Sequence, residues 1–153
     1  MRVVYKNMVV HPQVVQQAHQ AGCAAGKQGK FNEFRHSWWE LAFKNRKFDE
    51  EAIQNVAKAA GIDAAKLKTD TDSDECKQRV ANDAAELRKF HVNSTPTFFI
   101  NGGHVGGAIP KEQFKVLIDD KLKEVERSGV APADYYQKEV MGKGEKTFRS
   151  AKQ

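Results

Sequence analysis

The stretch Asn93-Ser94-Thr95-Pro96-Thr97-Phe98-Phe99-Ile100-Asn101-Gly102-Gly103 decides how this chain is interpreted. A Thr-Pro bond stands directly before a run of aromatic and β-branched residues, and Asn-Gly-Gly ends that run. The pattern predicts a turn, a strand and a hairpin loop. A second short strand, His104 to Gly107, is expected to pair back on the first. Because proline cannot donate to a sheet ladder, Pro96 must lie at the very start of the first strand.

The Thr95-Pro96 bond is a candidate for the cis isomer, which costs only about 0.5 to 1 kcal/mol more than trans before proline. We expect this geometry to leave the backbone of Thr95 unpaired and facing outward. The residues alone leave two interpretations open. One is an ordinary strand preceded by a bend, which is the commoner structure, and the other is a binding loop.

Length and composition favour one globular domain. The chain has 153 residues, of which 40% are hydrophobic, and this is enough to build a core. No apolar run approaches the roughly 20 residues that span a bilayer, and no secretion signal opens the chain as given. The net charge is +5, but the lysines are mixed with Asp and Glu. We therefore predict a solvated surface, with no membrane span and no nucleic-acid site.

Hydrophobic spacing and capping residues predict a short strand followed by a series of helices. The third helix is expected to have Asp49 as its N-cap and Gly61 as its C-terminal stop, and a later helix to have Ser73 or Asp72 as its N-cap. The predicted elements are the strand Arg2 to Lys6, a helix opening at Pro12, an aromatic helix from Phe31 to Phe43, the helix after Asp49, a short turn through Leu67, a helix reaching Phe90, and a final helix from Pro110 to Gly129.

Cys23 and Cys76 form no C-x-x-C pair, and they are too few and too separated in sequence to predict a zinc site or a disulfide scaffold. We expect Cys23 to be a buried and inert packing residue. Cys76 is placed in the first turn of a helix, where the positive dipole end lowers a thiol pKa, so it is the more reactive candidate. The acidic run from Asp70 fails as a calcium loop, because Glu75 stands where a glycine is needed. No metal site and no cofactor is predicted.

The order of these elements resembles that of the DsbA-like thiol:disulfide oxidoreductases of the thioredoxin superfamily, over roughly residues 2 to 140. The segments that carry the resemblance are the strand Arg2 to Lys6, the Ala-rich helix, Gly29-Lys30-Phe31, Gly61-Ile62-Asp63, Ser94 to Gly102, and Gly107-Ala108-Ile109-Pro110 with Phe114. The implied class is α/β, an incomplete thioredoxin-like fold with a small sheet and a large helical insertion. Residues 1–130 would form the DsbA-like domain, with the insertion at 12–90 and the cis-proline strand, hairpin and final helix at 93–127. Residues 131–153 would be a C-terminal extension that is partly frayed.

The resemblance also implies a binding site. Pro96 would be the cis-proline of the family, and Ser94, Thr95, Pro96 and Thr97 would bind an extended peptide or a protein partner through the backbone. The family carries a strand and a C-x-x-C helix before the segment that matches Arg2 to Lys6, and this chain has neither. No catalytic cysteine can be assigned, so we expect no redox turnover from this chain alone. The alternative is a non-catalytic module that binds peptides or proteins, and in either case family habit implies an extracytoplasmic, periplasmic location.

The absent strand would lie between Arg2 to Lys6 and Thr97 to Ile100, and its loss would leave unpaired backbone on both sides. Three outcomes are expected. The two flanking strands pair directly, a second copy covers the gap in a homodimer, or the natural protein is longer and this chain is a fragment. The homodimer has the simplest physical motive, because bare strand edges and apolar faces do not persist in water.

Overall fold

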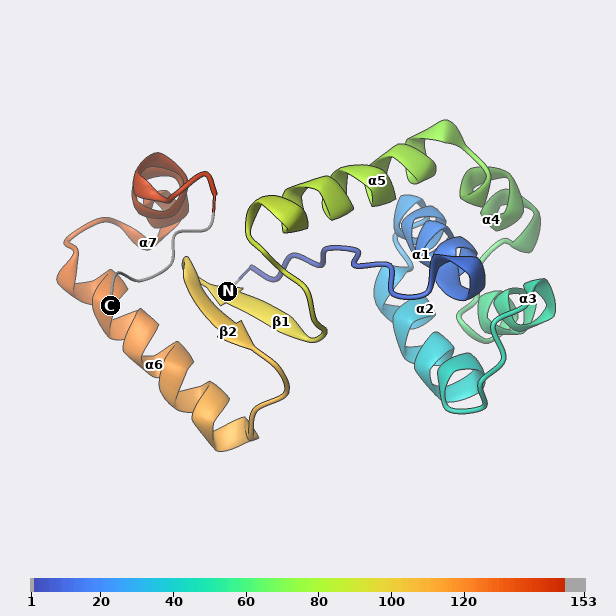
Figure 1. Cartoon of the computed structure of the whole chain (residues 1–153), viewed down its shortest axis with the longest axis horizontal. Helices are drawn as coiled ribbons and strands as arrows, with labels where there is room; N and C mark the ends of the chain where they lie inside the picture. Colours follow the sequence, from blue (N-terminus) through green and yellow to red (C-terminus); the bar gives the residue numbers. More distant parts are fainter. Residues whose placement is uncertain (1, 148–153) are drawn as a thin grey trace. The chain divides into compact units, whose positions relative to one another are not determined.

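The computed structural model describes residues 2–147 and divides them into two compact units, which meet in sequence between Leu87 and Arg88. The first unit is helical (Figure 1), and the second holds a β-hairpin and further helices. Among the described residues the sheet has two strands, and the rest of the regular structure is helical. The fold is therefore a mostly helical one with a small antiparallel hairpin.

The first unit consists of six helical segments. They are α1 (Pro12–Lys27), α2 (Phe31–Ser37), the π-helix η1 (Trp38–Phe43), α3 (Glu50–Ala59), α4 (Ala64–Thr71) and α5 (Asp74–Lys89), the last two residues of α5 lying past the boundary. α1 packs mainly on α4 and α2, and α3 packs on η1. Pro12 is at the start of α1, as predicted, while the aromatic helix continues as a π-helix from Trp38.

The core of this unit is built largely from alanine. Small side chains allow helix backbones to approach closely, and Leu67, Val56 and Val80 are the largest of the fully buried side chains. The buried cluster comprises Ala21, Ala24, Ala25, Phe34, Ala42, Ala52, Ile53, Val56, Ala57, Ala60, Ile62, Leu67 and Cys76.

The predicted caps hold the helices in place. Asp49 accepts a hydrogen bond from the Ala52 N–H at 2.8 Å, and Gly61 ends the helix region with a φ of +63°. Asp63 caps α4 through the Lys66 N–H at 2.9 Å. The Ser73 hydroxyl accepts from the Cys76 N–H at 3.3 Å, which confirms the prediction for α5.

The predicted strand at Arg2 to Lys6 is wrong, because residues 2 to 9 have no regular secondary structure. No strand pairs with this segment, and its side chains bind helices instead. The Tyr5 ring lies 5.2 Å from the Phe31 ring, and the Arg35 guanidinium lies 5.2 Å from the centre of the Tyr5 ring. Val3 and Val4 remain more than half exposed, at 59% and 54%. The first of the three expected outcomes, direct pairing with Thr97 to Ile100, is not found in the described sheet.

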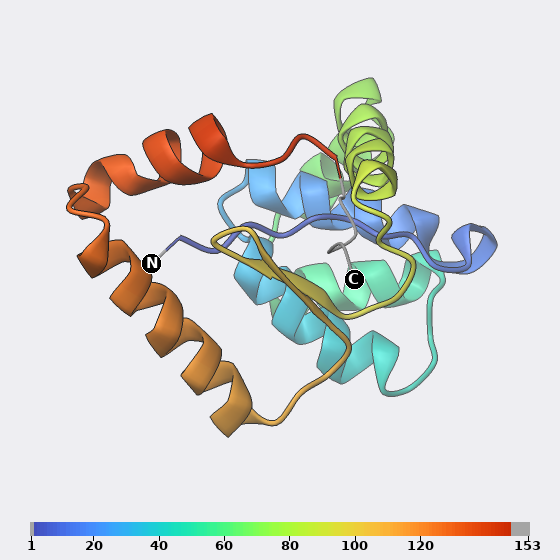
Figure 2. The ribbon, with the colours of Figure 1, turned by 60° about the vertical axis from the view of Figure 1, so that its left-hand side comes forward.

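The second unit contains the hairpin. β1 (Thr97–Ile100) pairs antiparallel with β2 (Gly103–Gly106), one residue earlier than predicted for the second strand (Figure 2). The two loop residues, Asn101 and Gly102, have φ values of 45° and 88°, as a tight hairpin with primed turn geometry requires.

Between the hairpin and residue 147, the last one described, the second unit has three helical segments. They are α6 (Lys111–Arg127), α7 (Pro132–Tyr135) and the π-helix η2 (Tyr136–Met141). Pro110 caps α6, and Gly129 follows that helix with a φ of +67°. The expected fraying of the C-terminal extension partly concerns residues 148–153, which lie outside the described residues.

Candidate functional site

The loop before β1 is held at both ends by hydrogen bonds within the second unit. The Thr95–Pro96 peptide bond is cis, as predicted. The Thr97 hydroxyl donates to the Ser94 carbonyl at 2.9 Å, and the Gly107 N–H donates to the Pro96 carbonyl at 2.8 Å. The hairpin therefore fixes Pro96 in register with the residue just past β2.

Aromatic contacts support the strand from both faces. The Phe98 ring packs edge-on against Phe114 of α6, with ring centres 4.7 Å apart. On the opposite face, Phe99 lies 5.7 Å from Phe90 and 5.4 Å from His104. Successive strand residues point to opposite faces, so this alternation follows directly from the sequence Phe98-Phe99.

The outer edge of β1 presents backbone groups away from β2. Pro96, Phe98 and Ile100 pair with Gly107, Val105 and Gly103 at alternate positions of the register. In an antiparallel ladder the intervening residues direct their N–H and C=O groups to the other side. The backbone groups of Thr97 and Phe99 therefore face the open edge. Thr95 lies two residues before Thr97, so its backbone is expected to face the same side, and the residue is exposed.

The four predicted site residues lie together because they are consecutive. Ser94, Thr95 and Pro96 are exposed, and Thr97 is part-buried. None of the four has an ionisable side chain, so the segment has no acid or base of its own. Its reactive side-chain groups are limited to serine and threonine hydroxyls. What it offers is a fixed and accessible backbone, which suits the recognition of an extended chain by strand addition.

Cys76 lies in the first turn of α5, as predicted, but the expectation that the two cysteines do not pair is wrong. Cys23 of α1 and Cys76 of α5 form a disulfide, with Cα atoms 5.6 Å apart and a sequence separation of 53. Cys76 is fully buried at 0% exposure, while Cys23 is part-buried, so neither is a free thiol. Sequence spacing cannot reveal such a pair, because helix packing sets the distance between the two Cα atoms.

A second polar cluster, which the sequence did not reveal, lies around Asp83 in the first unit. Asp83 is 6% exposed and accepts hydrogen bonds from the Asn7 N–H at 3.0 Å and from Asn7 Nδ2 at 2.7 Å. His19 Nδ1 lies 3.0 Å from Asn7 Oδ1, and Lys6 Nζ lies 3.2 Å from Asp83 and 2.8 Å from Glu86. The sequence indicated the burial of Asp83 only through helical spacing, because Asp83 follows the inward-facing Val80 by three residues.

The cluster changes the proton affinity of two of its members. The hydrogen bond to Glu86 is the main reason that the pKa of Lys6 lies above its ordinary value, against a smaller opposing effect of burial. Burial lowers the pKa of His19, because the charged imidazolium loses solvation. The cluster ties residues 6 and 7 to α5 and has the character of a structural anchor.

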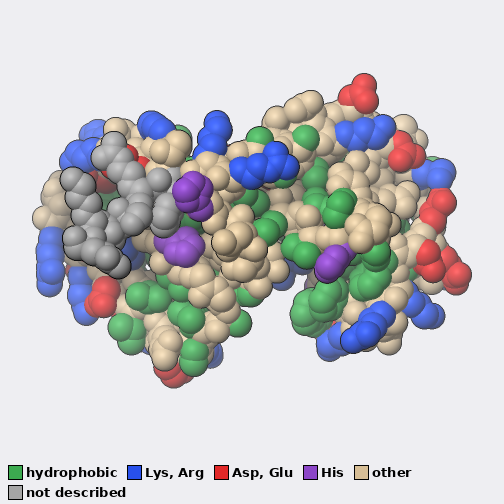
Figure 3. Space-filling model, viewed as in Figure 1, with side chains coloured by type: hydrophobic (Ala, Val, Ile, Leu, Met, Phe, Trp, Pro, Cys, Tyr) green, Lys and Arg blue, Asp and Glu red, His purple; other side chains and the backbone are tan. Residues whose placement is uncertain are grey.

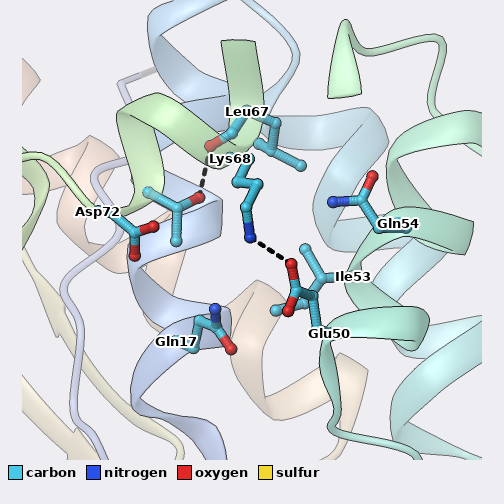
Figure 4. Close-up of a pocket in the computed structure, with 8 residues that line it drawn as sticks. Gln17, Glu50, Ile53, Gln54, Leu67, Lys68 and Asp72 are labelled. Carbon is cyan, nitrogen blue, oxygen red and sulfur yellow. Dashed lines mark hydrogen bonds and ion pairs between the residues drawn. The ribbon is translucent and has the colours of Figure 1, made fainter. Parts of the chain in front are cut away.

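A shallow pocket lies among α1, α3 and α4 (Figure 4). An ion pair between Lys68 and Glu50 crosses it, and the Thr71 hydroxyl donates to the Leu67 carbonyl at 2.7 Å. The pairing with Glu50 raises the pKa of Lys68. Lys68 and Glu50 already pair with each other, so neither charge is left unpaired for a ligand.

Residues 2–147 contain no cluster of three or more His, Cys, Asp or Glu side chains arranged to hold a metal ion. Within the same residues no helix combines the length and the apolar character that crossing a membrane demands. Hydrophobic side chains do reach the surface of each unit, over α2 and η1 in the first and over α6 in the second (Figure 3). Trp39 and Phe43 of η1 are exposed at 51% and 48%, with their rings stacked 4.6 Å apart.

The family model described as DSBA-like thioredoxin domain matches residues 3–119. No curated protein matches the chain. No solved structure matches it either.

Proposed function

The chain belongs to the DSBA-like thioredoxin domain family, and on that premise we propose that it is a DsbA-type oxidoreductase-like protein that holds an extended polypeptide at Ser94, Thr95, Pro96 and Thr97 without redox turnover of its own. The observation that carries the proposal is the open edge of β1. There the backbone groups of Thr97 face away from β2, beside an exposed loop that the hairpin holds in one register.

Strand addition explains both the site and its lack of ionisable groups. An extended peptide gains main-chain hydrogen bonds from a strand edge, and pockets for its alternate side chains add selectivity. The surrounding Phe90, Phe99 and His104 would give the bound chain an aromatic border. Such a site recognises unfolded or extended polypeptide of varied sequence.

The two cysteines support the absence of turnover. Dithiol exchange requires an accessible thiolate and a second thiol that resolves the mixed disulfide. The chain has Cys23 and Cys76 as its cysteines, and they are joined to each other with Cys76 fully buried. We expect no insulin reduction by this chain in the presence of dithiothreitol. Turnover clearly above the uncatalysed rate would refute this part of the proposal.

Binding is tested with a fluorescently labelled insulin B chain whose thiols are carboxymethylated, so that it can bind but cannot exchange. Replacing Thr97 with proline removes an N–H from the open edge and leaves the ladder to β2 intact. The expected result is a loss of affinity of about tenfold, which corresponds to about one or two hydrogen bonds. Fluorescence anisotropy measures the affinity.

The matched control is Thr97→Val, which removes the hydroxyl that donates to Ser94 and keeps the backbone N–H. We expect its affinity to stay within about twofold of the parent, since an exposed hydroxyl bond contributes little. Equal binding by Thr97→Pro and the parent would exclude recognition at this edge. Equal losses in both variants would indicate that the loop conformation, rather than the edge, is what matters.

A second candidate is a complete oxidoreductase in which a C-x-x-C helix is supplied to this domain. The family assignment favours it, and an extracytoplasmic location is part of the same proposal. The Cys23–Cys76 disulfide supports that location, because disulfides persist in oxidising compartments. Fusing a strand and a C-x-x-C helix upstream of Arg2 should confer insulin reduction, and failure of a folded fusion would count against this candidate.

We also propose that the chain forms a homodimer. The exposed Val3 and Val4 form an apolar surface that a second copy could cover. Light scattering at increasing protein concentration tests this directly. A mass that stays at one chain throughout would end the idea.

A further inference from the structure

α5 is attached to the first unit by few groups. Its fully inward face consists of Cys76, Val80 and Asp83, at spacings of four and three. Ala84 and Leu87 are only part-buried. A surface helix is usually held by a broad apolar stripe, and here the disulfide and the Asp83 cluster replace most of it. The covalent bond therefore fixes the first turn of α5, and the contacts of Asp83 with Asn7 and Lys6 fix the helix two turns later.

The two cysteines of the disulfide are not equally exposed. Cys76 has 0% exposure, whereas Cys23 is part-buried on α1. Thiol–disulfide exchange needs a thiolate to reach one sulfur atom while the other departs. Attack at Cys23 places the departing sulfur of Cys76 in the first turn of α5.

We propose that Cys23 is a site of S-thiolation by small cationic thiols, and that its modification releases α5 from the first unit. The incoming thiolate forms a bond with Cys23 Sγ as the Cys23–Cys76 bond breaks. The electron pair departs on Cys76 Sγ, which takes a proton from water. Each event consumes one thiol and leaves a mixed disulfide on Cys23 and a free thiol on Cys76, so the external thiol is the reductant.

Charge near the bond selects the thiol. Lys27 lies one turn after Cys23 on α1, and its ammonium contacts Asp70 at 2.9 Å and Glu75 at 2.8 Å. Within this triad one positive and two negative groups leave one net negative charge, carried by side chains that adjoin Cys23 and Cys76 in the sequence. A cationic thiol is therefore attracted and an anionic one repelled, and salt weakens both effects.

Opening the bond leaves α5 with Val80, the Asp83 contacts and the ion pairs Lys27–Glu75 and Lys6–Glu86. Once α5 moves away, Cys76 no longer lies beside Cys23, so the mixed disulfide is not resolved quickly. The site therefore acts as a switch that consumes thiol in stoichiometric amounts, which is compatible with the absence of insulin reduction. It is also independent of the proposed peptide site, which uses none of these residues.

The experiment treats the oxidised full chain with cysteamine under native conditions and traps free thiols with N-ethylmaleimide before peptide mass mapping. We expect cysteamine on Cys23 and maleimide on Cys76, in an excess of about tenfold over the reverse arrangement. Equal labelling, or cysteamine mainly on Cys76, would overturn the proposal. So would the absence of any adduct until urea is added, since the bond would then be purely structural.

Charge selection is tested by comparing cysteamine with mercaptopropionate at equal thiolate concentrations. The cysteamine rate should fall with added salt and the mercaptopropionate rate should rise. The variant Lys27→Gln should increase the preference for cysteamine. A salt dependence of the same sign for both thiols would exclude the electrostatic part of the proposal.

Release of α5 is read by hydrogen exchange on the cysteamine adduct. Amides of α5 from Cys76 to Asp83 should exchange about tenfold faster or more, while those of α1 and α3 keep their protection. The double variant Cys23→Ala, Cys76→Ala should show the same local pattern without any thiol. Unchanged exchange in α5, or equal acceleration in all helices, would contradict the proposed release.

Discussion

The two units of this chain stabilise their structure in different ways. The first unit encloses a cluster of fully buried side chains and closes it with a disulfide, whereas in the second unit no described residue falls in the buried class. The hairpin relies on its ladder, its turn and a few aromatic pairs such as Phe98 with Phe114. The proposed binding edge therefore belongs to the unit that buries less apolar surface. Local unfolding requires the least free energy in such a region.

Removing the disulfide should cause the largest change in stability. In the double variant Cys23→Ala, Cys76→Ala the free energy of unfolding of the first unit should fall by about 4 kcal/mol, the chain-entropy value for a loop of this length. Urea denaturation followed by the fluorescence of Trp38 and Trp39 measures the change. A loss below about 1 kcal/mol would mean that the non-covalent core suffices by itself.

The next effect comes from the core of the first unit. Leu67 has 0% exposure, so Leu67→Ala should destabilise that unit by about 3 kcal/mol through lost burial and a cavity. Phe98→Ala is the counterpart in the second unit. Because Phe98 is only part-buried, the change should cost about 1 kcal/mol, measured by hydrogen exchange of the hairpin amides. Equal losses would contradict the difference drawn between the units.

A smaller effect is expected at the Asp83 cluster. Asp83→Ala leaves two donors of Asn7 without their acceptor and should cost about 2 kcal/mol. The control is Glu86→Ala, which removes an exposed partner of Lys6 and should change stability by about 0.5 kcal/mol or less. Urea midpoints give both values, and comparable losses in the two variants would show that burial of Asp83 is unimportant.

The smallest effect is a pH dependence. Burial lowers the pKa of His19 from its ordinary 6.5, so below pH 6.5 the unfolded chain binds a proton that the folded chain does not. Stability of the first unit should therefore fall as the pH decreases from 6.5 toward the folded-state pKa, and level off below it. His19→Gln should flatten this part of the curve of urea midpoint against pH. His36→Gln, at an exposed position, should leave it unchanged, and an equal slope in all three proteins would refute the assignment to His19.

Local signals in the sequence predicted much of the helical fold. Asp49, Gly61, Ser73 and Pro110 fixed helix ends because a cap depends on neighbouring residues alone. The Thr95-Pro96 turn and the Asn101-Gly102 hairpin loop were recognised for the same reason.

The features that were missed depend on distant parts of the chain. Arg2 to Lys6 has strand composition, but a strand requires a neighbour and none is paired with it. Cys23 and Cys76 lie on different helices, α1 and α5, and Asp83 makes its contacts with Asn7 across a separation of 76 residues. Residues 94–97 could be named from the sequence, while the direction of their backbone groups required the register of β1 with β2.

The alanine core has a consequence for how this protein can change over time. Ala21, Ala24, Ala25, Ala42 and Ala57 are all at 0% exposure, so their methyl groups are enclosed by neighbouring atoms. A larger side chain at one of these positions would push two helices apart along their length. No single second substitution would restore the packing between them. These positions should tolerate glycine or serine poorly and valine or leucine worse. Substitutions on the surface of this unit should therefore be tolerated, whereas substitutions that change the volume of its interior side chains should not.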